Sequence, residues 1–88
     1  MFEWDEEKRL SNLAKHKLDF IAVSFFFDGR PSVTSTSNYS FEVRSITTAI
    51  NGRTFYTVVW TWRQERRRII SFRRARHGEE RAYRQIHG

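Results

Sequence analysis

The sequence predicts one α+β domain, in which N-terminal helices lead into an antiparallel sheet of three to four strands and a short C-terminal helix ends the chain. The chain has 88 residues, enough for one small core but not for two. Its residues are 39% hydrophobic and 16% aromatic, so bulky rings must supply much of that core. Helical spacing of apolar residues occurs near both ends, whereas β-branched and aromatic residues dominate the middle. Residues 1–88 are therefore expected to form a single domain.

Two short helices are expected before the sheet. Asp5 is suited to cap a helix over residues 6–15, because the acidic first turn and the basic last turn favour the helix dipole. Asp19 is suited to cap a second helix over residues 20–26, although the composition of that stretch fits a strand equally well. A turn follows at residues 28–31, where Gly and Pro interrupt the pattern.

The sheet is expected to begin after this turn. Residues 32–40 are rich in Ser and Thr, as in an edge strand followed by a loop. Asn51-Gly52 is a strong hairpin signal, because both central residues of a type I′ turn take positive φ. Three strands in a meander are therefore expected at residues 43–50, 53–62 and 67–75.

The C-terminal helix is expected over residues 79–87. Gly78 interrupts the strand pattern before it. Helical spacing predicts that Ala82, Tyr83 and Ile86 face the sheet.

The turn at Asn51-Gly52 predicts the register of the first hairpin. If Ile50 lies opposite Arg53, the same pairing continues along both strands. It places Glu42 opposite Thr61 and Arg44 opposite Val59.

A four-residue loop at residues 63–66 predicts the register of the second hairpin, with Thr61 opposite Arg68 and Trp62 opposite Arg67. Because side chains alternate between the faces of a sheet, one face gathers a polar group at one end. This group consists of Glu42, Arg44, Thr61 and Arg68. Arg67 and Arg73 are expected on the other face.

The positive charge is concentrated in the second half of the chain. Of sixteen Lys and Arg residues against ten Asp and Glu, residues 45–88 carry ten cations and three anions. Every cation after Lys17 is arginine, whose planar guanidinium forks onto phosphate and stacks on rings. Arginine interleaved with aromatic residues is typical of proteins that bind single-stranded nucleic acid. A solvated basic face and a surface for an acidic protein partner are the alternatives.

Two groups of side chains have the chemistry for phosphodiester cleavage. Glu42 can take a proton from an RNA 2′-hydroxyl while Arg44 and Arg68 hold the phosphate. The same residues can equally form a plain cross-strand ion pair. His16 is a second possible acid–base group, although a cation at the end of a helix also simply complements its dipole.

Several classes of protein are disfavoured by the composition. The chain contains no Cys, which excludes disulfide scaffolds and cysteine-based metal sites. It shows no histidine and carboxylate spacing for a metal, so we expect neither metal nor cofactor. Its longest apolar stretch is far shorter than the ~20 residues of a membrane span, and its N-terminus is acidic, unlike an export signal. A cytoplasmic protein that does not bind membranes is expected.

The chain resembles the BrnT-type toxins along essentially its whole length. The matching segments are Phe2-Glu3-Trp4-Asp5, Asn12-Leu13 with Lys15-His16, Glu42 with Arg44, Asn51-Gly52-Arg53, and the block from Arg68 to Ala75. This resemblance implies a RelE-like fold and a metal-independent ribonuclease toxin of a type II toxin–antitoxin pair, which slows translation. It also implies a BrnA-like antitoxin that neutralises the toxin in a hetero-oligomer and whose DNA-binding domain makes the only contact with DNA.

The resemblance also suggests functional residues. Arg44, Arg73 and Arg74 match recurrent basic residues of the family, Lys15 and His16 its Lys-His pair, and Tyr83 its late tyrosine. Together with Glu42, the catalytic candidates are Arg44, Arg73, Arg74, His16 and Tyr83. The candidates for RNA binding are Lys15, Trp62, Arg63, Arg67, Arg68 and Arg76. The chain departs from the family at Lys17, where a glycine usually ends the helix, and at Arg76, where a threonine often caps the last one.

Three functions therefore remain open on the sequence. The first is a ribonuclease toxin that leaves a 2′,3′-cyclic phosphate. The second is a non-catalytic module that binds single-stranded RNA with strong salt dependence. The third is a protein-interaction subunit whose basic face binds an acidic partner.

Overall fold

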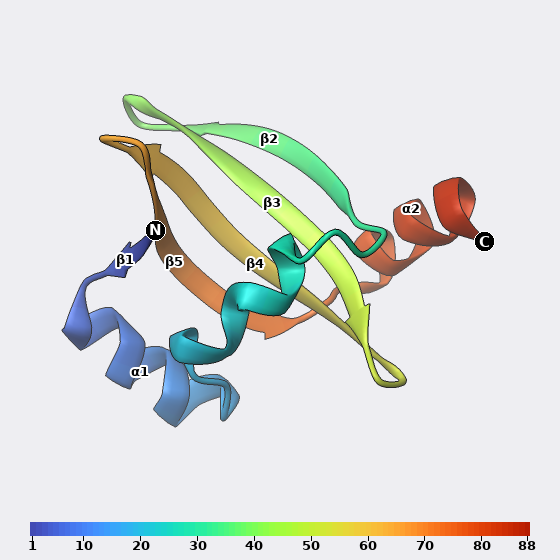
Figure 1. The fold of residues 1–88 in the computed structure, drawn as a ribbon, viewed down its shortest axis with the longest axis horizontal. Coiled ribbons are helices and arrows are strands. Elements are labelled where there is room, and N and C mark those ends of the chain that lie inside the picture. The colour runs from blue at the N-terminus through green and yellow to red at the C-terminus, as the bar shows by residue number, and fades with distance from the viewer.

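The computed structural model describes all residues, 1–88, and has the expected α+β class, with a helix or strand over most of the chain (Figure 1). The elements in chain order are β1 (Phe2–Trp4), α1 (Glu6–His16), η1 (Phe20–Phe27), β2 (Val33–Tyr39), β3 (Glu42–Asn51), β4 (Thr54–Arg63), β5 (Arg66–Arg74) and α2 (His77–His87). None of the three helices is both long enough and apolar enough to cross a membrane.

The expected sheet was wrong in its strand number and in its strand directions. The sheet has five strands in the order β1-β5-β4-β3-β2, and β1 runs parallel to β5, so it is mixed rather than an antiparallel meander of three to four strands. The missing strand is β1, whose Phe2 pairs with Arg67 and whose Trp4 pairs with Ile69. Three residues are too few to show a strand period, and this pairing depends on where α1 returns the chain.

The N-terminal helices follow the expected capping residues. The Asp5 carboxylate accepts from the Glu7 backbone N–H at 2.9 Å, and that of Asp19 accepts from Ile21 at 3.2 Å. The second segment is a 3₁₀ helix, which decides against the strand alternative. Lys17 ends α1 in the left-handed region, with φ of 61°, and its N–H reaches the Leu13 carbonyl at 2.9 Å. Lysine therefore occupies a conformation that glycine adopts without strain.

The first hairpin has a register two residues away from the expected one. Asn51 pairs with Thr54, so Gly52 and Arg53 form the turn, and only Gly52 takes positive φ, at 69°. This pattern is that of a type II′ turn rather than type I′. Because the shift is by two residues, every side chain keeps its expected face while its cross-strand partner changes.

The second hairpin has the expected register near its turn but not beyond it. Thr61 pairs with Arg68 and Trp62 with Arg67, as expected, although the loop is only the two residues Gln64 and Glu65. Further along, Val59 pairs with Ser71 and Trp60 with Ile69, which leaves Ile70 as the extra residue of a β-bulge.

The bulge changes the face of the sheet to which the side chains at the end of β5 point. Ile69 and Phe72 both lie in the core, and Arg73 pairs with Thr57 rather than Tyr56. Arg73 therefore lies on the face opposite to the one that strict alternation predicted.

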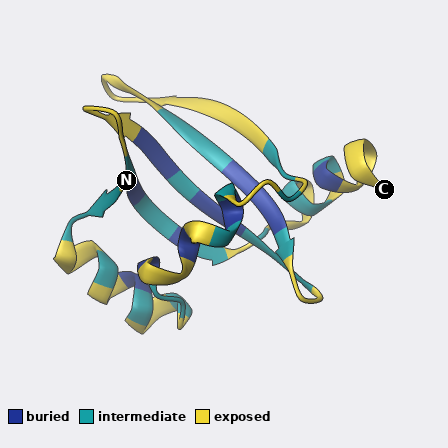
Figure 2. Cartoon of the chain, viewed as in Figure 1, coloured by how far each residue is buried: buried dark blue, intermediate teal, exposed yellow.

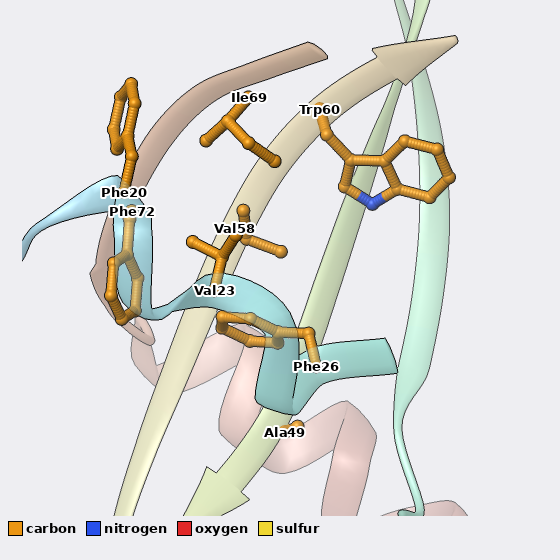
Figure 3. Close-up of a cluster of buried hydrophobic side chains, with 8 residues drawn as sticks. All are labelled: Phe20, Val23, Phe26, Ala49, Val58, Trp60, Ile69 and Phe72. Atoms are coloured by element: carbon orange, nitrogen blue, oxygen red, sulfur yellow. The ribbon is translucent and has the colours of Figure 1, made fainter. Parts of the chain in front are cut away.

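The core lies on one face of the sheet, which we call the core face. η1 crosses this face, and its buried side chains Phe20, Val23 and Phe26 pack on Ala49, Val58, Trp60, Ile69 and Phe72 (Figure 3). α1 packs beside β5, where the Asn12 side chain both donates to the Phe72 carbonyl at 2.7 Å and accepts from its N–H at 3.1 Å. The Asn12 amide thus satisfies the backbone groups of Phe72 that a neighbouring strand would otherwise pair with at this edge of the sheet.

The other face of the sheet is only partly covered, and we call it the open face. Thr48 and Thr57 alternate with the core residues Ala49 and Val58, so they point to the open face, where α2 packs against them. The strand centres are buried, whereas β2 and the hairpin tips are exposed (Figure 2). Contrary to expectation, Ile86 does not face the sheet and is 66% exposed.

Candidate functional site

A row of polar side chains crosses the open face near the tips of the hairpins. β-pairing places Ser37 beside Arg44, Thr61 beside Arg68, and Arg68 beside Glu3. Continuing the register of Ser45 with Trp60 by one residue places Arg44 beside Thr61. We call Ser37, Arg44, Thr61, Arg68 and Glu3 the tip row. It spans all five strands and contains two arginines separated by one strand.

Arg44 is held by two neighbours on this face. Its Nε donates to Oε2 of Glu42 at 2.9 Å, and its guanidinium lies 4.1 Å from the centre of the Tyr39 ring. Neither terminal nitrogen of Arg44 has a hydrogen-bond partner in the protein, and Glu42 uses only one of its oxygens. Both groups thus keep free hydrogen-bonding positions at the surface.

Arg68 has a different carboxylate from the one that the sequence suggested. Its Nη1 donates to Oε2 of Glu3 at 3.0 Å, while Glu42 contacts Arg44 alone. The expected group of Glu42 between Arg44 and Arg68 is therefore replaced by two separate ion pairs. Two features cause this change: the register of β3 with β4 places Arg44 rather than Glu42 opposite Thr61, and β1 brings Glu3 beside Arg68.

Arg73 lies further along the open face in a denser network under α2. Its two terminal nitrogens donate to the two carboxylate oxygens of Glu79, both at 2.8 Å. Glu79 also accepts from the Thr57 hydroxyl at 2.9 Å and from the Arg76 backbone N–H at 2.8 Å. Burial alone would raise the pKa of Glu79, but these donors outweigh it and lower the pKa to about 2.

A hollow of about 380 Å³ lies beside this network, between the start of α2 and strands β2 and β3. Ile46, Thr48 and Val33 form part of its lining, and the exposed Arg76 stands beside it. The Arg76 side chain has no ion-pair partner in the protein. The hollow combines an apolar floor with a free cation, a combination that suits a base and its phosphate.

The other expected catalytic residues are not brought to the tip row. Lys15 and His16 lie on α1 and line a hollow of about 270 Å³ with Ser71 of β5. Tyr83 is buried against Phe55, with ring centres 5.2 Å apart, and against His87 at 4.8 Å. Arg74 is exposed near Arg53 and Arg84, in a hollow of about 270 Å³. Of the catalytic candidates, only Glu42 and Arg44 form an ion pair with one another, while Arg73 Nη1 donates to the backbone carbonyl of Arg74 at 3.3 Å.

The comparison with protein families gives one match. The model of the ribonuclease toxin BrnT, of type II toxin–antitoxin systems, matches residues 4–79. The chain belongs to the BrnT family. Membership of this family implies an RNA substrate and an antitoxin partner. A search among curated proteins gave no match.

The RNA-binding candidates of this BrnT-family protein are divided between the two faces. Arg68 lies on the open face, and Arg76 stands beside the hollow there. Trp62 and Arg67 lie on the core face, where the Arg67 guanidinium is 4.7 Å from the Trp62 ring centre. Arg63 is exposed at the tip between them, paired with Arg66.

Two side chains that shape the site of this BrnT protein were not among the sequence candidates. Glu3 became a site neighbour only through β1, which gave no readable strand signal. Glu79 stands three residues after the residue that caps α2, a spacing from which its bond to the Arg76 N–H could have been predicted. Its stronger contact with Arg73 depends on the bulge in β5.

Proposed function

We propose that this protein cleaves RNA without a metal, by attack of a 2′-hydroxyl on the adjacent phosphorus, and thereby inhibits translation in the cytoplasm. A BrnA-like antitoxin with a DNA-binding domain neutralises it in a hetero-oligomer and makes the only contact with DNA. The observation that carries the proposal is the pair of Arg44, in the tip row, and the neighbouring Glu42, with donor and acceptor positions unused.

Arg44 and Arg68 bind the phosphate. They are two strands apart, or about 10 Å between backbones, and long side chains from that distance converge on one phosphate group. The two Nη groups of Arg44 and Nη2 of Arg68 have no partner in the protein, so they are available as donors. These donors stabilise the extra negative charge that develops on the phosphate oxygens in the transition state.

Glu42 takes the proton from the 2′-hydroxyl. Its Oε1 is free while Oε2 is held by Arg44, so the carboxylate is oriented and still able to accept. The 2′-oxygen forms a bond to phosphorus as the bond to the 5′-oxygen breaks, which leaves a 2′,3′-cyclic phosphate. Water at the exposed row supplies the proton for the leaving 5′-oxygen, because Tyr83 is buried elsewhere.

The bases of the RNA bind on either side of this centre. Tyr39 is exposed beside Arg44 and offers a ring on which a base can stack. The hollow at Ile46 and Arg76 lies on the same face, toward α2. The strand therefore runs along the open face from the hairpin tips toward α2.

A cleavage assay in EDTA tests this function. End-labelled RNA is incubated with the wild-type protein and with Arg44→Ala, Glu42→Gln and His16→Gln, and fragments and end groups are read. We expect cyclic-phosphate ends and a loss of about 10²–10³-fold in rate for Arg44→Ala and Glu42→Gln. Arg53→Ala is the matched control, since Arg53 is an exposed arginine at the opposite turn.

Each other outcome has a defined meaning. Full activity of Glu42→Gln with loss of activity in His16→Gln would move the base to the hollow beside α1. RNA that is retarded on a gel but never cut, even with ribosomes present, would instead support the non-catalytic RNA-binding module.

A further inference from the structure

A second exposed surface lies at the hairpin tips, on the core face beyond the end of η1. Trp62 is 58% exposed there and Val43 is 56% exposed. Continuing the register of β3 and β4 places these two side chains opposite each other, and the Thr61 hydroxyl bonds to the Val43 carbonyl at 2.9 Å. Arg67 pairs with Trp62 from the other side. We call Val43, Trp62 and Arg67 the tip shelf.

Arg67 is the unusual member of the tip shelf. Its guanidinium lies 4.1 Å from the centre of the Phe27 ring and 5.0 Å from that of Trp60, in addition to its contact with Trp62. Its side chain makes no hydrogen bond, and its Nε is buried without a partner, the only such side-chain atom in the protein. Rings satisfy the face of a guanidinium but not its edge, where the N–H groups point.

The surroundings of the shelf indicate the chemistry of what covers it. Arg63 and Arg66 add positive charge at the adjacent turn, with Glu65 the single carboxylate between them. Phe41, in the neighbouring turn between β2 and β3, is fully exposed at 105%. A surface of exposed aromatic and aliphatic side chains around an unsatisfied cation is complementary to a segment that carries both carboxylates and apolar side chains.

We propose that the tip shelf is the docking site for an acidic, apolar segment of the antitoxin. A carboxylate of that segment binds the terminal N–H groups of Arg67, which make no hydrogen bond within the protein, and its apolar side chains cover Trp62 and Val43. This inference rests on the toxin–antitoxin part of the proposed function, but not on the cleavage mechanism. Single-stranded RNA fits the shelf less well, because Val43 offers no stacking surface and the tip row lies on the opposite face.

The position of the shelf explains how such a segment would inhibit the toxin. Val43 is flanked in β3 by Glu42 and Arg44, whose side chains point to the open face. The tip shelf and the tip row lie on opposite faces of the same strand ends. An antitoxin segment bound to the shelf therefore reaches the tip row by continuing around the hairpin turns. The shelf thus provides affinity, and the continuation of the segment over the turns blocks the phosphate site.

The test uses the full-length toxin and the purified antitoxin encoded with it. Calorimetry measures their affinity for the wild type, for Trp62→Ala and for the control Ile86→Ala, another largely exposed apolar residue, on α2. We expect Trp62→Ala to weaken binding by about 30-fold or more, as for an aromatic anchor, and Ile86→Ala to change it less than about threefold. Val43→Ser also removes exposed apolar surface from the shelf and should weaken antitoxin binding, while its RNA cleavage rate without antitoxin stays within about twofold of wild type.

A third variant tests the role of the guanidinium. Arg67→Met keeps an apolar stem between the rings and removes the unpartnered Nε, so its thermal midpoint should be equal to or above that of the wild type. We expect its affinity for the antitoxin to fall by about tenfold and the salt dependence of binding to decrease.

Unchanged affinity in all three variants would overturn the proposal. Cleavage that is lost in Trp62→Ala while antitoxin affinity is kept would also overturn it, and would identify the shelf as an RNA platform. If the wild-type protein cuts no RNA at all, the ribonuclease proposal fails, yet the affinity measurements still decide whether the shelf binds the antitoxin.

Discussion

The two ends of the open face use the same kind of ion pair for different purposes. Under α2, the side chains of Arg73 and Glu79 are 13% and 20% exposed, and two parallel hydrogen bonds join them. At the tips, Arg44 and Glu42 are joined by one bond, and their side chains are 22% and 42% exposed. Every oxygen of Glu79 is occupied, whereas Glu42 and Arg44 keep unused positions.

This difference separates a structural arginine from one that is available to a substrate. A guanidinium whose two terminal nitrogens both bind one partly buried carboxylate fixes neighbouring elements, and here it joins β5 to α2. Arg44, in contrast, is oriented by one hydrogen bond from Nε and by the Tyr39 ring, and its terminal nitrogens stay available to a substrate. The family resemblance places Arg44 and Arg73 together as functional residues, but the structure gives them different surroundings. The following predictions test that distinction, from the largest expected effect to the smallest.

Replacing Arg73 should cost stability, whereas replacing Arg44 should not. Arg73→Met leaves Glu79 half-buried without its main counter-ion, which should lower the free energy of unfolding by about 2–4 kcal/mol. Arg44→Met is the matched control and should change it by less than about 1 kcal/mol, because a surface pair contributes little. Urea unfolding of both variants measures the difference. Equal losses would show that the Arg73–Glu79 pair contributes no more to stability than the Arg44–Glu42 pair.

The acid side of the stability profile should also depend on Glu79. Its pKa is about 2 in the folded protein against 4.5 for the free side chain, so its stabilising effect is complete above pH 4.5. That effect is lost as the pH falls toward 2, and it amounts to about 1–2 kcal/mol once solvent screening is allowed for. Urea unfolding of wild type and Glu79→Gln at pH 6 and at pH 2.5 should show the gap closing at the lower pH. Parallel profiles for the two proteins would contradict this role of Glu79.

The smallest expected change in stability is at Lys17, which lies away from both ion pairs, at the end of α1. Lys17 has φ of 61°, so Lys17→Gly should raise the free energy of unfolding by about 0.5–1 kcal/mol. Lys15→Gly is the control, since residue 15 is still helical, in the last turn of α1, and it should lower stability by up to about 1 kcal/mol. Thermal unfolding with opposite shifts for the two variants would confirm that the strain is local to residue 17.

Local signals predicted the parts of this fold that depend on neighbouring residues in sequence. Asp5 and Asp19 cap their helices because capping needs only the next two or three residues. The pairing of Thr61 with Arg68 followed from the position of the second turn. The face on which Arg44 and Glu42 lie was also correct, because a register error of two residues preserves the faces.

The parts that failed depend on contacts between distant segments. β1 was missed because three residues carry no readable period, and its partner is some sixty-five positions away, as in the pair of Glu3 with Arg68. The bulge at Ile70 was missed because one extra residue leaves no mark in the alternation of a short strand. The strand β1 brings Glu3 to Arg68, and the bulge brings Arg73 to the face on which Glu79 lies.

The sequence by itself determined the α+β class, the BrnT resemblance and the concentration of arginine in the second half of the chain. These follow from composition, local pattern and the residue types at matched positions, none of which requires knowledge of the packing. Only the tertiary structure decided which arginines bind a carboxylate through both terminal nitrogens and which keep terminal nitrogens without a partner. An ion pair forms between side chains that the fold brings within about 3 Å, and the parallel pairing of β1 and the bulge in β5 decide which carboxylate that is.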